Sequence, residues 1–356
     1  MLNLTDIDQG ARNLLINCAQ LKAGDNLLIV AEKQSCGWYK ANATKSVSKV
    51  ARKLKINFKI QQVEGPETSS SRELEKIMQS YDCTIFFARI GDQNRFESSK
   101  LRGKRVMCYA RSAQDLASSF GTVHHQAMIN IKDSLNDLFL NSQHVELSCP
   151  QGTRLSGKML NRNFYINSDV SVLRFPMLVP MPILTSSFSG KVLISNYLTS
   201  TGSQTYTPNS VKILSPLTIT IGNGKINGVN GSDTDVINFN EHYKFVSKKF
   251  GLNKSCVHSW HAGIHPGTRY LKSVEDDPDQ WSNTIFGSPN YLHFHTCGER
   301  PPGEICWMVK DPTIKIDGNP LWEQGVLNVE DFEITRNCLK EWPELKFLYQ
   351  SGKQAA

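Results

Sequence analysis

The hydrophobic pattern of the first 143 residues alternates between helical spacing and short, continuous apolar runs. Apolar residues recur at intervals of three and four between residues 5 and 21, which predicts an amphipathic helix. Further helices are predicted over residues 38–54, 70–80 and 113–141. Residues 26–31 form a continuous apolar run, as expected of a strand covered on both faces, and further strands are predicted over 56–63, 83–88 and 104–110. Helices that alternate with such strands predict an α/β domain over 1–143, with a Rossmann-like open parallel sheet.

From His144 onward, helical spacing gives way to short strands separated by Gly, Pro, Ser and Asn. Strands are predicted over 145–148, 163–167, 190–197 and 211–214, followed by a hairpin from 217 to 229 that turns at Gly222-Asn223-Gly224. One amphipathic helix is predicted over 238–250, and helical sequence follows Val329. The second half, 144–356, is therefore predicted to be a β-rich α+β domain that ends in a helix.

Five of the nine histidines lie in one stretch, from His258 to His295. Its sharpest feature is the pair His293 and His295, because residues 291–296 are aromatic and apolar enough to form a strand. Residues two apart in a strand project from the same face, so two imidazoles would point into one space. Neutral imidazole is the commonest metal ligand, and this pair therefore predicts a metal site. An H-x-H pair can also be only the polar face of an exposed strand.

The segment before this strand offers further histidines as a third ligand. His261 and His265 are four apart, but two glycines and a proline within 263–267 disfavour a helix there. We therefore predict a loop that carries at most one ligand. His258 is the preferred ligand, with His261 next.

Glu304 is the candidate carboxylate ligand. It follows a Pro-Pro-Gly turn and precedes the apolar run 305–309, which predicts a buried strand. A carboxylate at the head of a buried strand is costly unless a charge or hydrogen bonds satisfy it, and a metal ion would do so. Alternatively, Glu304 points to solvent or pairs with Arg300.

Composition and charge exclude several other functions. The 356 residues include 39% hydrophobic ones, enough for a sizeable core in two domains. The net charge is +7, but the basic residues are scattered and no nucleic-acid-binding motif is present. Nucleotide-binding glycine motifs are also absent, and no apolar run is long enough to span a membrane. Nine cysteines without C-x-x-C pairs and the absence of a secretory signal favour a cytoplasmic protein.

Several short motifs carry a resemblance to a known family. They are G-A-R-N-L-L…L-K-A-G-D-N-L-L-I-V, G-K-V…L-T-I-T-I-G-N-G-K-I-N-G-V, A-G-I-H-P-G-T-R and D-P-T-I-K-I-D-G. With them the chain resembles the thermophilic aminopeptidase (aminopeptidase T) superfamily, including its dihydroxypyridine dioxygenase-like branch. The resemblance implies a two-metal site in the first case, and in the second a single iron held by one histidine and a late H-x-D pair. It also implies a homodimer.

This chain departs from that ligand pattern. His258 matches the early histidine with one residue of slack, but Glu304-Ile305-Cys306 stands where we align the late H-x-D. Two or three histidines with one carboxylate suit a single divalent ion, with Fe(II) favoured and Zn(II) as the alternative. We therefore expect a mononuclear non-haem iron oxygenase acting on a small aromatic or amino-acid-like substrate. The alternatives are a metallo-aminopeptidase-like hydrolase using zinc or cobalt, and a catalytically inactive binding protein on the same scaffold.

Residues near this stretch are candidates for orienting a small-molecule substrate. Arg269, Arg300 and Lys310 could each hold a carboxylate or phenolate, although a residue of this kind, taken singly, is more often a solvated rim charge. Tyr291 could help to form an aromatic pocket, for which the other candidates are Trp260, Tyr270 and Trp307. Aromatic residues of a β domain more often belong to the core.

Overall fold

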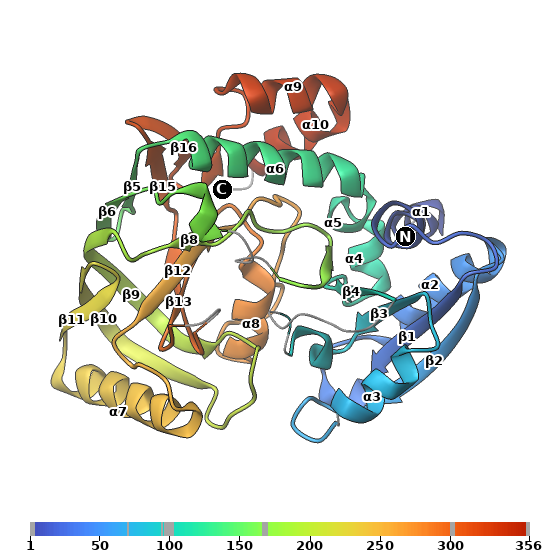
Figure 1. Cartoon of the computed structure of the whole chain (residues 1–356), viewed down its shortest axis with the longest axis horizontal. Coiled ribbons are helices and arrows are strands. Elements are labelled where there is room, and N and C mark those ends of the chain that lie inside the picture. Colours follow the sequence, from blue (N-terminus) through green and yellow to red (C-terminus); the bar gives the residue numbers. More distant parts are fainter. Residues whose placement is uncertain are drawn as a thin grey trace. The chain divides into compact units, whose positions relative to one another are not determined.

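The computed structural model describes residues 4–69, 71–93, 95, 103–165, 170–299 and 303–353. Contacts divide the chain into two compact units. The first comprises Met1–Asn130 and Val170–Leu178, and the second Ile131–Asp169 and Val179–Ala356 (Figure 1). The sequence predicts one boundary at 143/144, whereas this division falls within helix α6 (His125–Asn141) and returns one later strand to the first unit.

The first unit is built on a parallel five-stranded sheet in the order β2-β1-β3-β4-β7. Its strands are β1 (Asn26–Glu32), β2 (Asn57–Val63), β3 (Cys83–Phe87), β4 (Lys104–Cys108) and β7 (Leu173–Phe175). The predicted open parallel sheet is thus confirmed, and four of its strands are the four predicted apolar runs. The central strands β1 and β3 are almost wholly buried, whereas the edge strand β2 is largely exposed.

The helices of the first unit follow the predicted order, except that one predicted helix is interrupted twice. They are α1 (Leu4–Arg12), the π-helical η1 (Asn13–Cys18), η2 (Gln34–Cys36), α2 (Ala41–Lys53), α3 (Ser71–Met78), η3 (Arg89–Asp92), α4 (Ala113–Ala117) and α5 (Ser119–Thr122). The predicted helix 113–141 is divided into α4, α5 and α6. Ser118 causes the first break, because its extended backbone ends α4 and its hydroxyl accepts the Phe120 N–H to begin α5.

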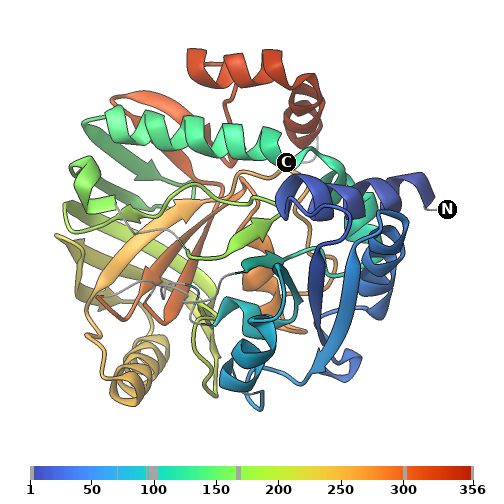
Figure 2. The ribbon, with the colours of Figure 1, turned by 45° about the vertical axis from the view of Figure 1, so that its right-hand side comes forward.

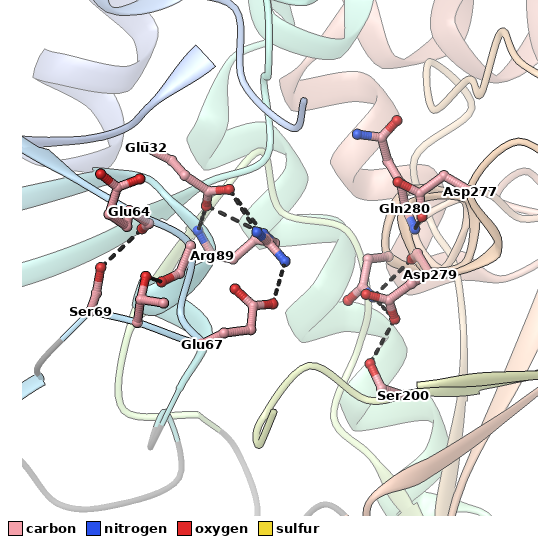
Figure 3. Close-up of polar contacts among 12 residues, drawn as sticks. Glu32, Glu64, Glu67, Ser69, Arg89, Ser200, Asp277, Asp279 and Gln280 are labelled. Carbon is pink, nitrogen blue, oxygen red and sulfur yellow. Dashed lines mark hydrogen bonds and ion pairs between the residues drawn. The ribbon is translucent and has the colours of Figure 1, made fainter. Parts of the chain in front are cut away.

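The order of strands reverses between β1 and β3, as in flavodoxin-like sheets. Glu32 ends β1 with a buried carboxylate, and Arg89 follows β3. The Arg89 backbone N–H donates to Glu32 Oε2 (2.8 Å), its Nε donates to Glu32 Oε1 (3.0 Å), and a third nitrogen reaches Glu67 (3.1 Å) (Figure 3). These bonds satisfy a buried charge that would otherwise be costly.

The second unit contains a curled twelve-stranded sheet whose neighbouring strands are antiparallel. The main path runs β17-β16-β15-β5-β6-β9-β14-β13-β12-β8, with β10 and β11 joined to it through β9. Its strands are β5 (His144–Ser148), β6 (Arg154–Lys158), β8 (Ile183–Leu184), β9 (Phe188–Ser200), β10 (Ser210–Gly222), β11 (Lys225–Asn230), β12 (Val257–Ala262), β13 (Tyr291–Thr296), β14 (Ile305–Lys310), β15 (Thr313–Ile316), β16 (Asn319–Glu323) and β17 (Val326–Leu327). The predicted β-rich second half is confirmed.

Helices in the second unit are few. Besides the greater part of α6, they are η4 (Arg162–Tyr165), α7 (Asp233–Phe250), α8 (Pro278–Ile285), α9 (Glu333–Glu341) and α10 (Pro343–Lys353). Figures 1 and 2 both show α6 alongside α9. Among the described residues, no helix has the length and apolar character needed to cross a membrane.

Two local predictions are wrong. Residues 163–165, expected in a strand, lie in the short helix η4, and residues 166–167 lie outside the described residues. The segment after Cys256, expected to be a loop, begins with strand β12. Gly263 and Pro266 do exclude a helix, but they lie beyond the end of β12 and so leave the extended backbone before them intact.

A row of large aromatic side chains fixes the register of β12, β13 and β14. Trp260 pairs with Phe294, and Phe294 pairs with Trp307, and all three are fully buried. Phe139 of α6 and Phe188 of β9 pack edge-on against Trp260, with ring centroids 5.8 and 6.1 Å apart. The apolar face of these three strands therefore lies in the core of the unit, and the alternate residues point to the opposite face.

In the turn after β12, Gly263 packs directly against the backbone of Gly287 and Ser288, so a larger residue at this position should destabilise the protein. A Cβ on Gly263 would lie 2.2–2.4 Å from the backbone of Gly287 and Ser288. We expect Gly263→Ala to lower the free energy of unfolding by roughly 1–3 kcal/mol, because backbone must move to admit the methyl group. Gly228→Ala in β11 is the control, since its nearest contact is 3.9 Å away. Urea unfolding measures both, and equal stabilities would contradict this account.

Candidate metal centre

Three histidines converge on the polar face of β12 and β13. His293 and His295 are two apart in β13, and His261 of β12 pairs directly with His293. Directly paired residues and residues two apart share a face of a sheet. Ligand nitrogens from all three side chains lie within 4.8 Å of one another. Among the described residues, this is the one group of three or more potential ligands that meets this limit.

The geometry of the group is tight. The Nε2 atoms of His261 and His295 are 3.0 Å apart, and the three ring centroids are separated by 4.0–5.1 Å. Nitrogens that bind one ion through bonds of about 2.1 Å lie about 3.0–3.4 Å apart at the usual coordination angles. The side chains are buried, with 4–8% of each residue exposed. These distances thus suit ligands of a single ion.

The tautomer of His261 is set by a backbone carbonyl. His261 Nδ1 lies 3.3 Å from the carbonyl oxygen of Pro180, which can only accept a hydrogen bond. Nδ1 therefore carries the proton when this bond forms, and Nε2 presents its lone pair towards His295. A carbonyl that fixes a histidine in this way is the usual outer partner of a metal ligand.

An apolar layer covers the same face of the sheet. Trp281 and Ile285 of α8 pack with Cys306 and Met308, which pair with His295 and His293 across β13 and β14. Phe286, directly after α8, lies edge-on to the His293 ring at 5.7 Å. The three histidine residues beside this layer are only 4–8% exposed, and such burial lowers the local dielectric constant.

Hydrogen bonds between serine, threonine and aspartate side chains hold α8 against β9. Ser282 bonds to Thr199 (2.8 Å), and Ser200 donates to Asp279 Oδ1 (2.6 Å) (Figure 3). Asp279 also accepts from Asn283 (3.2 Å), so its buried carboxylate is satisfied within the helix and the adjoining strand.

His258, the preferred early ligand, lies outside the group of three histidines. Val257 pairs with Thr296 and Ser259 pairs with His295, which leaves His258 as the extra residue of a β-bulge. Its Nδ1 lies 2.9 Å from the Ser259 hydroxyl. Burial lowers the pKa of His258 to about 4. The H-x-H pair is brought together with His261, the second choice from the sequence. His258 was preferred because the strand and its bulge were not recognised.

Glu304 is also outside the group. Its carboxylate accepts bonds from Ser203 at 2.9 Å to each oxygen, and the Tyr206 hydroxyl donates to its backbone carbonyl (2.8 Å). The residue is buried, so it does not point to solvent as the alternative expected. Arg300, its expected ion-pair partner, lies outside the described residues.

His265 lies in the turn that follows β12. It is fully buried, and its Nδ1 accepts the Gly267 N–H (3.1 Å) while its own backbone N–H donates to Gly287 (2.8 Å). Burial lowers its pKa to about 3. The ring is therefore neutral at ordinary pH and stabilises the turn.

The residues expected to orient a substrate are dispersed. Arg269 is exposed, and Lys310 is exposed beside Asp311 at 3.8 Å. Tyr291 is half-buried on the same strand face as His293 and packs edge-on against Trp281. Trp260 and Trp307 belong to the core row, in agreement with the alternative stated for them. Tyr270 lies next to the apolar layer, and its hydroxyl donates to Asp277.

A separate hollow lies elsewhere in the second unit. It has a volume of about 510 Å³ and is lined by Asp137, Leu138, Asn141, Ser142, Ile316, Asp317, Asn319, Phe332, Glu333, Ile334 and Asn337. None of the three converging histidines lines it.

The described chain has the fold of the class that the sequence resembles: a parallel α/β sheet followed by a large antiparallel sheet. It is similar to 2,5-dihydroxypyridine dioxygenase from Pseudomonas putida KT2440, with a TM-score of 0.63 over 94% of this chain and 100% of that chain. It is also similar to wild-type AmpT, an aminopeptidase T from Thermus thermophilus, with a TM-score of 0.50 over 91% and 99%. The sequence identities are 9% and 10%, so the likeness concerns the fold.

Comparisons of sequence give no match. No protein-family model matches the chain, and no curated protein does.

The buried neutral His265 predicts a specific loss of stability in acid. Its pKa is about 3 in the folded protein and about 6.5 when unfolded, so below pH 6.5 the unfolded state gains a proton that the folded state does not. The unfolding free energy should fall by about 2 kcal/mol between pH 6.5 and 5 through this group alone. Its remaining effect of about 0.4 kcal/mol at pH 6.5 vanishes by about pH 7.5.

His265→Asn tests this expectation, because asparagine can keep the acceptor for the Gly267 N–H and does not titrate. Urea unfolding at pH 7 and pH 5 should show a smaller loss of stability in the variant than in the wild type. His258 and His242, whose pKa values burial also lowers to about 4, remain in both proteins and cancel in the comparison. The same pH dependence in both proteins would contradict the assignment.

Proposed function

We propose that this protein is a metal-dependent enzyme with a mononuclear centre held by His261, His293 and His295. The observation that carries the proposal is the convergence of three imidazoles within 4.8 Å on a buried, water-excluding face. Three histidines with a position left for another group are a donor set of catalytic metal sites.

We favour Fe(II) and an oxygenase acting on a small aromatic or amino-acid-like substrate. Imidazole donors suit iron as well as zinc, and the fold is similar to that of a dioxygenase over nearly the whole chain. Bound Fe(II) would supply one-electron chemistry with dioxygen. The chain itself holds His261 in one tautomer through Pro180 and excludes water through Trp281 and Phe286. We also propose that Tyr291, on the same strand face as His293, contacts the substrate.

A zinc- or cobalt-dependent hydrolase is the second candidate, because the fold is also similar to that of AmpT. Two hydrolytic metals need bridging carboxylates to balance their charge. The described group contains three histidines and no carboxylate, which favours one ion over two. A binding protein without catalysis is the third candidate, and it predicts that no metal is bound.

We also expect a homodimer, which light scattering coupled to size-exclusion chromatography would detect.

Metal stoichiometry tests the ligand set. Purified anaerobically and loaded with Fe(II), the wild type should hold about one ion per chain. His261→Ala should weaken metal binding at least about tenfold, since one of three donors is lost. His258→Ala is the matched control, because this histidine lies in the same strand and outside the group. Equal losses in both variants would overturn the assignment of His261.

Glu304→Gln separates the three-histidine set from the set that includes this carboxylate. The change keeps the shape and the capacity to accept from Ser203 while it removes the charge. We expect unchanged metal stoichiometry and affinity. A loss comparable to that of His261→Ala would place Glu304 among the ligands.

Activity assays distinguish the two classes of enzyme. Oxygen uptake by the Fe(II)-loaded protein should occur with dihydroxylated aromatic or heteroaromatic compounds. The zinc- and cobalt-loaded proteins should not cleave aminoacyl-arylamides. Two zinc or cobalt ions per chain, together with such cleavage, would establish the hydrolase instead.

A further inference from the structure

We propose that the exposed face of helix α2 binds the phosphate backbone of nucleic acid without regard to base sequence. This basic surface is defined by Lys45, Lys49 and Arg52. It belongs to the first unit, whereas the three converging histidines belong to the second, so the proposal does not depend on a metal centre. It follows from the distribution of charge along the chain, from the ion pairs of the described residues and from the packing of α2.

The net positive charge of the chain comes from one segment. Residues 33–63 contain eight lysine and arginine residues and no aspartate or glutamate, whereas the rest of the chain contains 32 basic and 33 acidic residues. The basic residues of the segment are Lys33, Lys40, Lys45, Lys49, Arg52, Lys53, Lys55 and Lys59. A surface with charges of one sign attracts ligands of the opposite sign.

The cations of the basic surface have no acidic partner among the described residues. Lys33 and Lys53 each form an ion pair with one carboxylate. Lys45, Lys49 and Arg52 are exposed and form no ion pair within 4.0 Å with any residue that the structure describes. Lys45 and Lys49 are four apart in a helix without acidic residues, and like charges at this spacing destabilise a helix. A polyanion on this face would relieve the repulsion.

The three cations form a row along α2. Residues three and four apart lie on the same side of a helix, and the row extends about 10 Å at a rise of about 1.5 Å per residue. Each strand of a nucleic-acid duplex carries a phosphate about every 3.4 Å of its axis, so a row of this length passes about three phosphates. The Arg52 guanidinium lies over the Phe58 ring of β2 at 5.5 Å, which limits its motion at one end of the row.

Two other kinds of acidic partner fit this surface less well. A helix that binds a membrane surface inserts its apolar face into the lipid. The apolar face of α2 is buried in the unit instead, through Ala43, Val47, Val50 and Ala51. Protein interfaces are depleted in lysine, which is the commonest cation of this segment. Lysine and arginine are the usual partners of phosphate oxygens in nucleic acid.

The basic surface carries no motif that reads bases. Contacts with phosphates position a nucleic acid and carry no sequence information directly, so binding should be the same for unrelated base sequences. The proposal revises the expectation, drawn from the scatter of basic residues along the sequence, that nucleic acid is not a partner.

The test titrates the full-length chain into a fluorescently labelled DNA duplex of about 20 base pairs and follows its anisotropy. In about 50 mM salt we expect a dissociation constant below about 10⁻⁴ M for two unrelated sequences. The variant with Lys45→Gln, Lys49→Gln and Arg52→Gln should bind at least about tenfold more weakly. The slope of the logarithm of the binding constant against the logarithm of salt concentration should become shallower by about 2–3, because each lost phosphate contact removes about 0.9.

A matched control removes the same charge from another helix. Lys244→Gln, Lys248→Gln and Lys249→Gln take three exposed cations from α7, and Lys249 also lies over a phenylalanine ring, at 5.6 Å. This variant should bind the duplex within about threefold of the wild type, because salt screens distant exposed charges. Equal losses in the two triple variants would overturn the assignment to α2.

A conservative variant excludes a loss of folding as the cause. Lys45→Arg with Lys49→Arg keeps both charges and should keep the affinity of the wild type for the duplex. A tenfold loss in this variant would contradict binding through charge.

Further probes identify the partner. An RNA duplex and a single-stranded DNA of the same length distinguish the sources of the phosphate backbone, and binding of either that is lost in the α2 variant supports the proposal. Vesicles that contain phosphatidylserine represent an acidic membrane, and poly-glutamate represents an acidic protein. Tighter binding of the wild type to either of these than to every nucleic acid would overturn the proposal, as would the absence of any binding to nucleic acid.

Discussion

The register of β12, β13 and β14 is the constraint on which the candidate site depends. Trp260, Phe294 and Trp307 form one cross-strand row, and burial of each large aromatic side chain contributes about 2–3 kcal/mol. A slip of one residue would turn this row towards the opposite face and would carry the histidines into the core. The same packing that stabilises the sheet therefore brings His261 opposite His293.

The two faces of these strands carry different kinds of side chain. One is filled by aromatic rings and tolerates no charge, and the other presents imidazoles beneath the apolar layer formed with α8. Imidazole suits such a place, because it is neutral at ordinary pH and can satisfy one nitrogen on a backbone carbonyl. His261 does this with Pro180, so its remaining nitrogen is oriented at little cost in side-chain entropy.

Much of the fold could be predicted from the sequence because its strands are continuous apolar runs with helices between them. The H-x-H pair was also visible, since period-two spacing needs only a strand. His261 was named as the third ligand only after His258, because β12 ends at Ala262 just before Gly263 and was taken for a loop, and because a bulge gives His258 a place outside the ladder. Bulges and pairing partners depend on tertiary contacts, and Glu304 likewise meets Ser203 only through the fold.

The fold determines the positions of candidate metal-ligating side chains, but it does not determine which residue type occupies each position. His293-Phe294-His295 has the spacing of the H-x-D pair that the resemblance implies and carries a second histidine in place of an aspartate, but it stands one strand before Glu304-Ile305-Cys306, where we align that pair. Either residue fits the same strand face, because the pleat determines direction and not charge. A similar fold at 9% sequence identity therefore does not imply that the candidate ligand residues carry the same charge in both proteins. In a metal site of this kind, exchange of one carboxylate for one neutral imidazole would raise the net charge of the site by one.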